Sequence, residues 1–443
     1  MAITFQPIGR PPPAAPAELT AGRVTDTSMR WQGLVRRIGF LASGSLLMYW
    51  AMQAWARGQI GVHHEVLFMV IIMYAFAFVL LGAAVADVRW LTRWQALIPI
   101  GVLLGLAVNF YVDIEIAMPF YGTDTIAFSH EAAERLLQGE NPFSVHGEET
   151  IAAVSERYDV PSTFVTPTTD GVNIDRLMSW PAGHLLLFVL PLKLGLTDLR
   201  WVVVVAELAT LLILWLKAPA SIRPLALLPI AMDPDQSVRF TSGGVTDFLW
   251  VLPLVGTAFF LRDRRYLLAA LLFGTAAAVK QQPWLLAPFL AIWVWHDHQG
   301  LPAVQRARMV ATFAVASLIG FLILNLPFAV WDPRGWLQGV LLPFEEDLIP
   351  FGSGFSMLTQ VGVVQLPRSF YTLATLGVWG ILIVAYAVHF RSLKHTIWLL
   401  PGVVLWFSYR SLQSYFIYWT PLLIIALFFW WEDATLEEKL DAA

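Results

Sequence analysis

The chain has 443 residues, of which 57% are hydrophobic and 14% are charged, and its mean hydropathy is +0.63. Soluble domains carry about 25% charged residues, so this composition excludes an ordinary soluble fold and predicts a polytopic membrane protein. The absence of Cys excludes disulfides, thiolate nucleophiles and Cys-based metal sites. Continuous apolar runs favour helices over a β-barrel, and no basic and aromatic face indicates nucleic acid as a partner.

The N-terminal third predicts a tail, three spans and an external acidic segment. Residues 1–30 are rich in Pro and Ala and lack the apolar core of a signal peptide, so we expect a disordered cytoplasmic tail. Apolar runs follow at 38–56, 66–86 and 95–112. Arginines precede the first run and separate the second from the third (Arg30, Arg36, Arg37, Arg89 and Arg93). Under the positive-inside rule both places are cytoplasmic, and the acidic segment 113–179 is external.

The run 180–196 allows two topologies. It contains Pro181 and Pro191, which suit an irregular segment more than a full span. If the run crosses, the later basic loops lie outside; if it only dips into the external leaflet, Lys217 and Arg262 lie in the cytoplasm. The charge bias favours the dip. Such a backbone is tolerated only where protein or water covers it, as in the wall of a substrate cavity.

The remaining runs complete the predicted bundle. They lie near 199–217, 222–232, 245–261, 265–280, 283–296, 309–327, 369–390, 396–409 and 418–431. We therefore expect an all-α polytopic membrane protein of about 12 spans, in a range of about 11–13, with both termini inside. The membrane domain covers 31–432, its second external segment is 328–368, and 433–443 is a cytoplasmic tail.

The stretch 121–143 is the principal candidate for chemistry. Asp124 opens an amphipathic helix that stops at Gly139 and suits the membrane surface. Asp124 is either a capping residue or a functional acid. Glu131 and Glu134 are expected on a solvated face, although Glu131 and its neighbour His130 are also substrate-binding candidates.

Cations at the external ends of spans are candidate ligands for an anion. Lys280 follows an ascent of about 22 Å from Arg265, which places it in the outer half of a core about 30 Å thick. A buried cation normally has a partner or a function, and phosphate is the obvious partner. Arg410 is a second candidate and Arg239 a third. The remaining substrate-binding candidates, all external or at span ends, are Asp247, Gln281 and Tyr415.

Asp233 and Asp235 are weak candidates for a metal site. Their carboxylates suit a divalent cation, yet Asp-Pro-Asp equally forms a turn, and no third ligand stands at motif spacing. We therefore predict no metal ligands, and keep Asp233 and Asp235 only as weak candidates. A divalent cation, Mg²⁺ or Mn²⁺, stays open as a cofactor. No phosphate loop, dinucleotide fingerprint or hydrolase motif is present.

Four segments together resemble the GT-C glycosyltransferases, in particular the bacterial polyprenyl-phosphate-mannose-dependent mannosyltransferases. They are Asp124 with its Ala-rich helix and the Gly139–Phe143 end, Trp180-Pro181, Gly243-Gly244 with Asp247, and Gly274 with Lys280-Gln281 and Pro283. These segments cover about half of the chain. The chain departs from the family in having two spans before the one that leads into the acidic loop, and in placing Asp113 and Glu115 near Asp124 rather than an Asp-Asp pair.

The resemblance implies an inverting transfer of a mannose-like hexose or a pentose from a polyprenyl-phosphate donor to a lipid or glycan acceptor. Asp124 would be the general base, with Asp113 and Glu115 as competitors, and Lys280, Arg410 and Arg239 would bind the donor phosphate. The enzyme would work on the external face of the inner membrane and serve the cell envelope. The alternatives are a transporter or flippase of a lipid-linked or anionic solute, and a ligase or polymerase of lipid-linked glycans.

Overall fold

The structure is a computed structural model that describes residues 18–86, 93–145, 154–161, 177–231, 234–345 and 349–441. These residues fold almost wholly into helices. The strands among them are two-residue segments, β1 (Phe351–Gly352) and β2 (Arg410–Ser411), which pair in parallel. The predicted all-α class is confirmed.

Five helical stretches of the described chain are long and apolar enough to cross a membrane: His64–Val85, Leu97–Ala117, Ala303–Trp331, Arg368–Val388 and Gln413–Leu436. They correspond to α2 (His64–Val85), α4 (Leu97–Val112) with the π-helix η1 (Asp113–Ala117), α14 (Ala303–Trp331), α17 (Arg368–Val388), and α20 (Gln413–Ile417) with α21 (Thr420–Asp441). Shorter apolar helices are α7 (Gly183–Lys193), α11 (Phe248–Arg262) and α12 (Tyr266–Val279). The expected total of about 12 spans is not confirmed, because several apolar runs break into short helices.

The other elements surround these helices. They are α1 (Glu18–Arg57), α5 (Asp124–Leu137), η2 (Pro142–Ser144), α8 (Arg200–Lys217), η4 (Arg223–Leu227), α9 (Leu228–Ala231), α10 (Pro234–Gly243), η5 (Gln282–Leu286), α13 (Ala287–Asp297), α15 (Pro333–Glu345), α16 (Met357–Gln360), α18 (Phe390–Leu393), η6 (Lys394–Trp398) and α19 (Leu400–Trp406). Helix α1 begins at Glu18, which differs from the disordered tail expected over 1–30. The prolines that would interrupt a helix end at Pro16. Helix α21 likewise continues through most of the expected tail 433–443.

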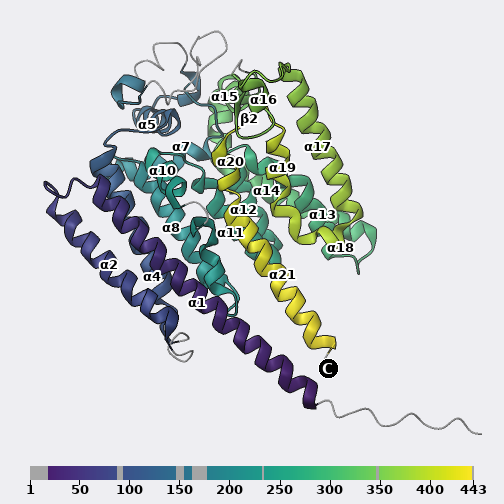
Figure 1. The fold of residues 1–443 in the computed structure, drawn as a ribbon. Helices are drawn as coiled ribbons and strands as arrows, with labels where there is room; N and C mark the ends of the chain where they lie inside the picture. The colour runs from purple at the N-terminus through teal and green to yellow at the C-terminus, as the bar shows by residue number, and fades with distance from the viewer. Residues whose placement is uncertain are drawn as a thin grey trace, which may run out of the picture.

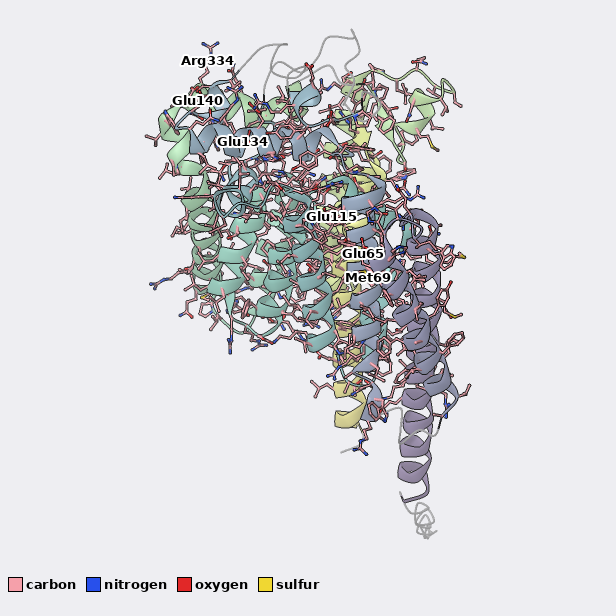
Figure 2. The ribbon with its side chains drawn as sticks, turned by 90° about the vertical axis from the view of Figure 1, so that its left-hand side faces the viewer. Glu65, Met69, Glu115, Glu134, Glu140 and Arg334 are labelled. Carbon is pink, nitrogen blue, oxygen red and sulfur yellow. The ribbon has the colours of Figure 1, made fainter. Side chains whose placement is uncertain are left out.

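The helices form a bundle with distinct ends (Figure 1). Helices α1, α2 and α4 pack together on one side, α8, α11, α12 and α14 lie in the middle, and α13, α17 and α19 form the other side. Helices α5, α15 and α16 gather with β2 at one end, while α21 finishes at the other. Figure 2 shows Glu134, Glu140 and Arg334 at the α5 end. The two segments predicted to be external thus share one end of the molecule, which is called the α5 end below.

Helix α7 occupies most of the run 180–196. It has 11 residues, which span about 16 Å at 1.5 Å per residue, about half of a membrane core. It packs chiefly against α5, and the chain then turns into α8. A helix of this length is too short to cross the core unaided, and the dip into the external leaflet stays a prediction.

Candidate active site

A cavity of about 1510 Å³ lies below α5, and most of the predicted site residues line it. Its lining includes Asp124, Lys280, Arg410, Arg239, Asp247, Gln281 and Tyr415. Five cationic side chains and three carboxylates of the described chain reach it: Arg57, Arg239, Lys280, Arg368, Arg410, Asp113, Asp124 and Asp247. Residues from 57 to 415 therefore meet at one place, and the positive charges outnumber the negative ones.

Asp124 owes its position to close backbone contacts between two loops. Gly122 donates a backbone hydrogen bond to Gly243 (2.9 Å), and a Cβ on Gly122 would come 3.0 Å from the Gly243 Cα. Thr123 precedes the helix and donates its hydroxyl to the carbonyl of Gly244 (3.2 Å). Gly244 has φ +93°, and a Cβ there would meet Ile126 at 2.4 Å. Glycines are thus required at 122 and 244 to bring the first turn of α5 onto the cavity wall.

Arg200 fixes the loop that leads to Asp124. Its side chain is only 2% exposed and donates to four backbone carbonyls, those of Ile114, Met118, Phe120 and Ser242. It also pairs with Asp198 at 2.5 Å. Because five donors of a planar guanidinium suit several acceptors at once, one side chain holds η1, the following loop and α10 together. The sequence analysis did not single out Arg200.

Helix α5 ends as the sequence indicated. Gly139 has φ +85°, and its amide donates to the Leu136 carbonyl (3.0 Å), which is the geometry of a glycine C-cap. Asn141 then accepts the amide of Phe143 through its side chain (3.0 Å), and the Phe143 ring packs on Phe328. The Gly-x-Asn-Pro-Phe end therefore has a structural purpose: it stops the helix and anchors it to α14.

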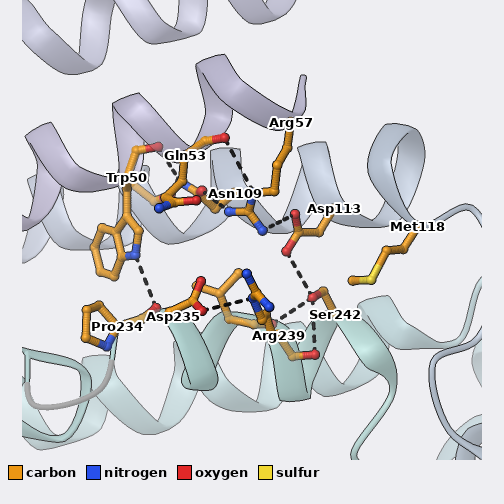
Figure 3. A network of polar contacts seen from close by, with 12 residues as sticks. Trp50, Gln53, Arg57, Asn109, Asp113, Met118, Pro234, Asp235, Arg239 and Ser242 are labelled. Carbon is orange, nitrogen blue, oxygen red and sulfur yellow. Dashed lines mark hydrogen bonds and ion pairs between the residues drawn. The ribbon is translucent and has the colours of Figure 1, made fainter. Parts of the chain in front are cut away.

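Asp113 is held in a buried network at the cavity wall (Figure 3). Arg57 pairs with Asp113 (2.5 Å) and donates to Asn109 (2.9 Å), while Ser242 donates its hydroxyl to the second Asp113 oxygen (3.2 Å). The Asp113 side chain is fully buried. Glu115, the other competitor, is exposed, accepts the indole of Trp201 (3.0 Å) and does not line the cavity. These placements favour Asp124 as the acid that meets a ligand.

Lys280 pairs with Asp247 inside the cavity wall. Its ammonium lies 2.7 Å from the carboxylate, and the two side chains are 11% and 1% exposed. The same carboxylate oxygen accepts the indole of Trp250 (2.5 Å), and the ammonium lies 5.9 Å from the ring centre of Tyr415. The predicted phosphate ligand Lys280 and the predicted substrate ligand Asp247 are therefore partners of each other. Their combined charge is zero, which leaves less attraction for a phosphate than a lone lysine would offer.

Arg410 and Arg368 line the cavity from β2 and from the start of α17. Arg410 is half-buried, and its guanidinium makes no ion pair within the described residues. Its backbone is fixed by the β1–β2 pairing, in which Phe351 faces Arg410. Arg368, at the start of α17, stacks over the Tyr409 ring at 5.8 Å. The sequence analysis missed Arg368, because an arginine at a span end resembles an interfacial anchor.

Arg239 lines the cavity from α10, whereas Arg368 lies on α17 and Arg410 on β2. It pairs with Asp235, one helical turn earlier on α10 (2.9 Å), and its side chain is 57% exposed. Figure 3 places both beside Asp113 and Ser242. Asp233 lies outside the described residues, and within the described part of the chain no group of three or more His, Asp or Glu side chains is arranged to hold a metal ion.

His130 and Glu131 lie outside the cavity, on the outer face of α5. His130 shares a hydrogen bond with the Tyr121 hydroxyl (2.9 Å). Glu131 is 3% exposed and accepts from Arg135 (2.7 Å) and Arg157 (2.5 Å). Glu131 was expected on a solvated face; the segment that carries Arg157 and Tyr158 covers it instead. We call these six residues, together with Glu134, the outer network.

The outer network shifts the pKa of several of its members, including His130 and Tyr158. Burial lowers the pKa of His130, against the opposing charge of Glu134. Burial also raises the pKa of Tyr158, and its hydrogen bond to Glu134 (2.9 Å) acts in the same direction. The histidine is therefore neutral and the tyrosine protonated near neutral pH, which suits a structural role.

Gln281 has a structural role at the cavity wall. Its amide donates to the carbonyls of Ser179 (2.9 Å) and Val340 (2.8 Å). It therefore ties α15 and the segment before α7 to the end of α12, and both of its donor hydrogens are used within the protein.

Comparisons with protein-family models, with curated proteins and with solved structures found no match to this chain. The function is therefore inferred from the chemistry of the site itself. The site offers a carboxylate at a helix N-terminus, two arginines and a neutral Lys–Asp pair around a cavity large enough for two ligands. This arrangement suits proton removal from one ligand and charge stabilisation on another.

Proposed function

We propose that the protein is a membrane glycosyltransferase of the GT-C type, with a bundle of about 12 spans. It would move a mannose-like hexose or a pentose from a polyprenyl-phosphate donor to a lipid or glycan acceptor. The single observation that supports this proposal is the meeting of Asp124 with Arg368 and Arg410 in one cavity of about 1510 Å³. The cavity lies at the α5 end, which we assign to the external face of the inner membrane.

In the proposed reaction, the Asp124 carboxylate accepts the proton of an acceptor hydroxyl. The hydroxyl oxygen attacks the anomeric carbon from the face opposite the phosphate, so the configuration inverts. The bond between the anomeric carbon and the phosphate oxygen breaks, and polyprenyl phosphate leaves with the bonding electrons. Arg410 and Arg368 stabilise its growing charge through bidentate hydrogen bonds.

Lys280 and Asp247 have a revised role in this proposal. The opposite charges of the two side chains cancel, and the pair lies beside the reacting atoms. The Tyr415 ring lies over the ammonium. Lys280 can turn one of its three donors to the phosphate while it keeps Asp247 as partner. The residue therefore contributes to orientation more than to net attraction.

A transport function is the second candidate, since a large cavity with a buried ion pair also suits the passage of an anionic solute. The purified protein in sealed vesicles, supplied with a radiolabelled polyprenyl-phosphate sugar, separates the two. A labelled acceptor product and released polyprenyl phosphate support transfer. Movement of the label across the vesicle membrane without bond cleavage supports transport and overturns the proposal. Extension of a glycan that is already lipid-linked supports the ligase alternative.

The same assay addresses the cofactor. Removal of divalent cations with a chelator, followed by addition of Mg²⁺ or Mn²⁺, measures whether transfer depends on a metal. Activity that persists with chelator assigns charge stabilisation to the arginines alone. Activity that returns only with the metal adds a cation to the donor site.

A further inference from the structure

We infer that the turn around α16, residues 356–366, is a membrane anchor that inserts its apolar side chains among the lipids at the α5 end of the bundle. Its partner is the headgroup and upper acyl region of one phospholipid leaflet. The inference does not depend on the proposed transfer of a sugar, because its evidence is the position and the exposure of the turn. We call residues 356–366 the α16 turn.

The α16 turn exposes an apolar surface. Residues 360–365 are all exposed. The large apolar side chains exposed on the turn are Met357 (48%), Val361 (64%), Val363 (68%) and Val364 (40%). The sequence from 348 to 367 contains no Asp, Glu, Lys, Arg or His. Single apolar side chains are normal on a surface, whereas several together in an uncharged segment mark a site of interaction with an apolar partner.

Polar and aromatic contacts fix the α16 turn against the start of α17. The hydroxyls of Thr359 and Tyr371 share a hydrogen bond (2.5 Å), and the Thr359 hydroxyl also accepts the amide of Leu366 (3.4 Å). The ring of Phe355, just before the turn, lies 6.0 Å from that of Phe370. The turn therefore lies beside the first turns of α17, as Figure 1 shows for α16 and the upper end of that helix.

Helix α17 indicates where lipid lies. Its 21 residues span about 31 Å at 1.5 Å per residue, which matches the thickness of a membrane core. The residues of α17 that line the cavity include Arg368, Thr372, Thr375 and Trp379. Its exposed apolar residues include Phe370, Leu373, Ile381, Val384 and Val388. At about 100° per residue the two sets fall on opposite faces of the helix, so the face turned away from the cavity is the one that meets lipid.

Aromatic side chains mark the level of the membrane interface at the α5 end. Trp331 ends α14 and is 51% exposed, and Trp406 ends α19 and is 43% exposed. Exposed tryptophans at the ends of apolar helices are typical of the interface. Phe355 donates its amide to the Trp406 carbonyl (2.8 Å), and their rings lie 5.9 Å apart. The chain thus enters the α16 turn at the level of the headgroups.

A lipid surface suits the α16 turn better than a protein partner does. Interfaces between proteins combine an apolar centre with a polar rim, whereas the stretch 348–367 offers no charged side chain for such a rim. Phe370, which packs on Phe355, belongs to the lipid face of α17. The apolar surface of the turn therefore continues that of the helix, and one leaflet covers both.

The anchor also bears on the cavity. Strand β1 directly precedes the turn and pairs with β2, and Phe351 and Arg410 from these strands line the cavity. Ser353 donates its amide to the Ser411 carbonyl (2.8 Å), which extends this connection toward the turn. A turn held in the leaflet therefore keeps this side of the cavity at the depth of the lipid headgroups.

Site-directed spin labelling tests the anchor. The chain contains no Cys, so each single-cysteine variant carries one label without any other substitution. In lipid nanodiscs, electron paramagnetic resonance compares the accessibility of the label to oxygen, which concentrates in lipid, with that to a water-soluble nickel complex. We expect the ratio of oxygen to nickel accessibility to be several-fold higher for Val361→Cys and Val363→Cys than for a label in water.

Two reference positions calibrate the ratio. Ile381→Cys lies on the lipid face of α17 and gives the value for the membrane core. Arg334→Cys replaces an exposed arginine of α15 at the α5 end (Figure 2) and gives the value for water. Ratios at 361 and 363 as low as that at 334 would place the turn in water and overturn the inference.

The remaining outcomes identify any other cover of the turn. Low accessibility to both reagents means that protein covers the labels and rejects the lipid anchor. Broadening between spins that disappears on dilution with unlabelled protein identifies that cover as a second copy of the chain.

The unmodified protein provides a test without substitutions. A lipid-soluble diazirine reagent in the nanodisc should label the peptide that contains residues 356–366, and its absence from that peptide would contradict the anchor. Neither measurement needs sugar transfer, so a protein with an inserted turn and no transferase activity retains the anchor and rejects only the proposed function.

Discussion

The two faces of α5 use polar residues in different ways. On the outer face, Glu131 and Glu134 meet arginines and a tyrosine, and Glu140, just beyond the end of the helix, meets Arg135. On the cavity side, Asp124 opens the helix beside a wall whose cations exceed its carboxylates. The pairs on the outer face are made within the protein and indicate stability, whereas the cavity side brings an acid and several cations to a space that can hold a ligand.

The largest expected effect is on turnover, from Asp124→Asn. A general base contributes about 10²- to 10⁴-fold to rate, and the amide cannot accept the proton, so sugar transfer should fall by that factor. Transfer from a radiolabelled polyprenyl-phosphate sugar measures the loss, and farnesyl phosphate binding should be unchanged. Turnover near that of the wild type would remove Asp124 as the base and reduce the contrast between the two faces.

The next effect is on stability, from Lys280→Met. This variant leaves the Asp247 carboxylate buried without its cation, and breaking such a pair costs about 3–5 kcal/mol. Adding Asp247→Asn should restore most of the loss, because the double variant has no buried charge. Thermal unfolding in nanodiscs gives the comparison. An equally stable single variant would mean that the pair does not form.

Glu131→Gln should affect stability without affecting the chemistry. The variant weakens two charged hydrogen bonds of a side chain that is 3% exposed, at a cost of about 1–3 kcal/mol. Turnover per folded molecule should match the wild type. A loss of turnover as large as that of Asp124→Asn would place Glu131 in the reaction and remove the distinction between the faces.

The smallest effect concerns pH. Burial holds the pKa of His130 below its ordinary value near 6.5, so the folded state binds fewer protons than the unfolded state. The contribution of His130 to stability is complete above about pH 6.5 and is lost as the pH falls below that value and through the lower pKa of the folded state. His130→Gln should reduce the change in melting temperature between pH 7.5 and 5. His64 is exposed, and His64→Gln should leave that change as it is in the wild type.

The sequence predicted the local features of the site and missed the long-range ones. The helix from Asp124, its stop at Gly139 and the shallow run 180–196 follow from periodicity, turn residues and charge bias. The pairing of Lys280 with Asp247, 33 residues apart, needs the packing of α11 and α12. Arg57 and Arg368 were overlooked as span-end anchors. Arg57 stands alone at the external end of the first apolar run, where the positive-inside rule disfavours a cation. That position was the signal that could have identified Arg57 as a site residue.

The clamp made by Arg200 has a consequence for biosynthesis. Met118, whose carbonyl it binds, precedes Arg200 by 82 residues, so the loop before Asp124 leaves the ribosome well before its anchor. The loop before Asp124 cannot take its final form until α8, which carries Arg200, has been made. The β1–β2 pairing sets a later condition, because Arg410 reaches the cavity only when the last part of the chain is made. The cavity is therefore complete only after nearly all of the chain has been made.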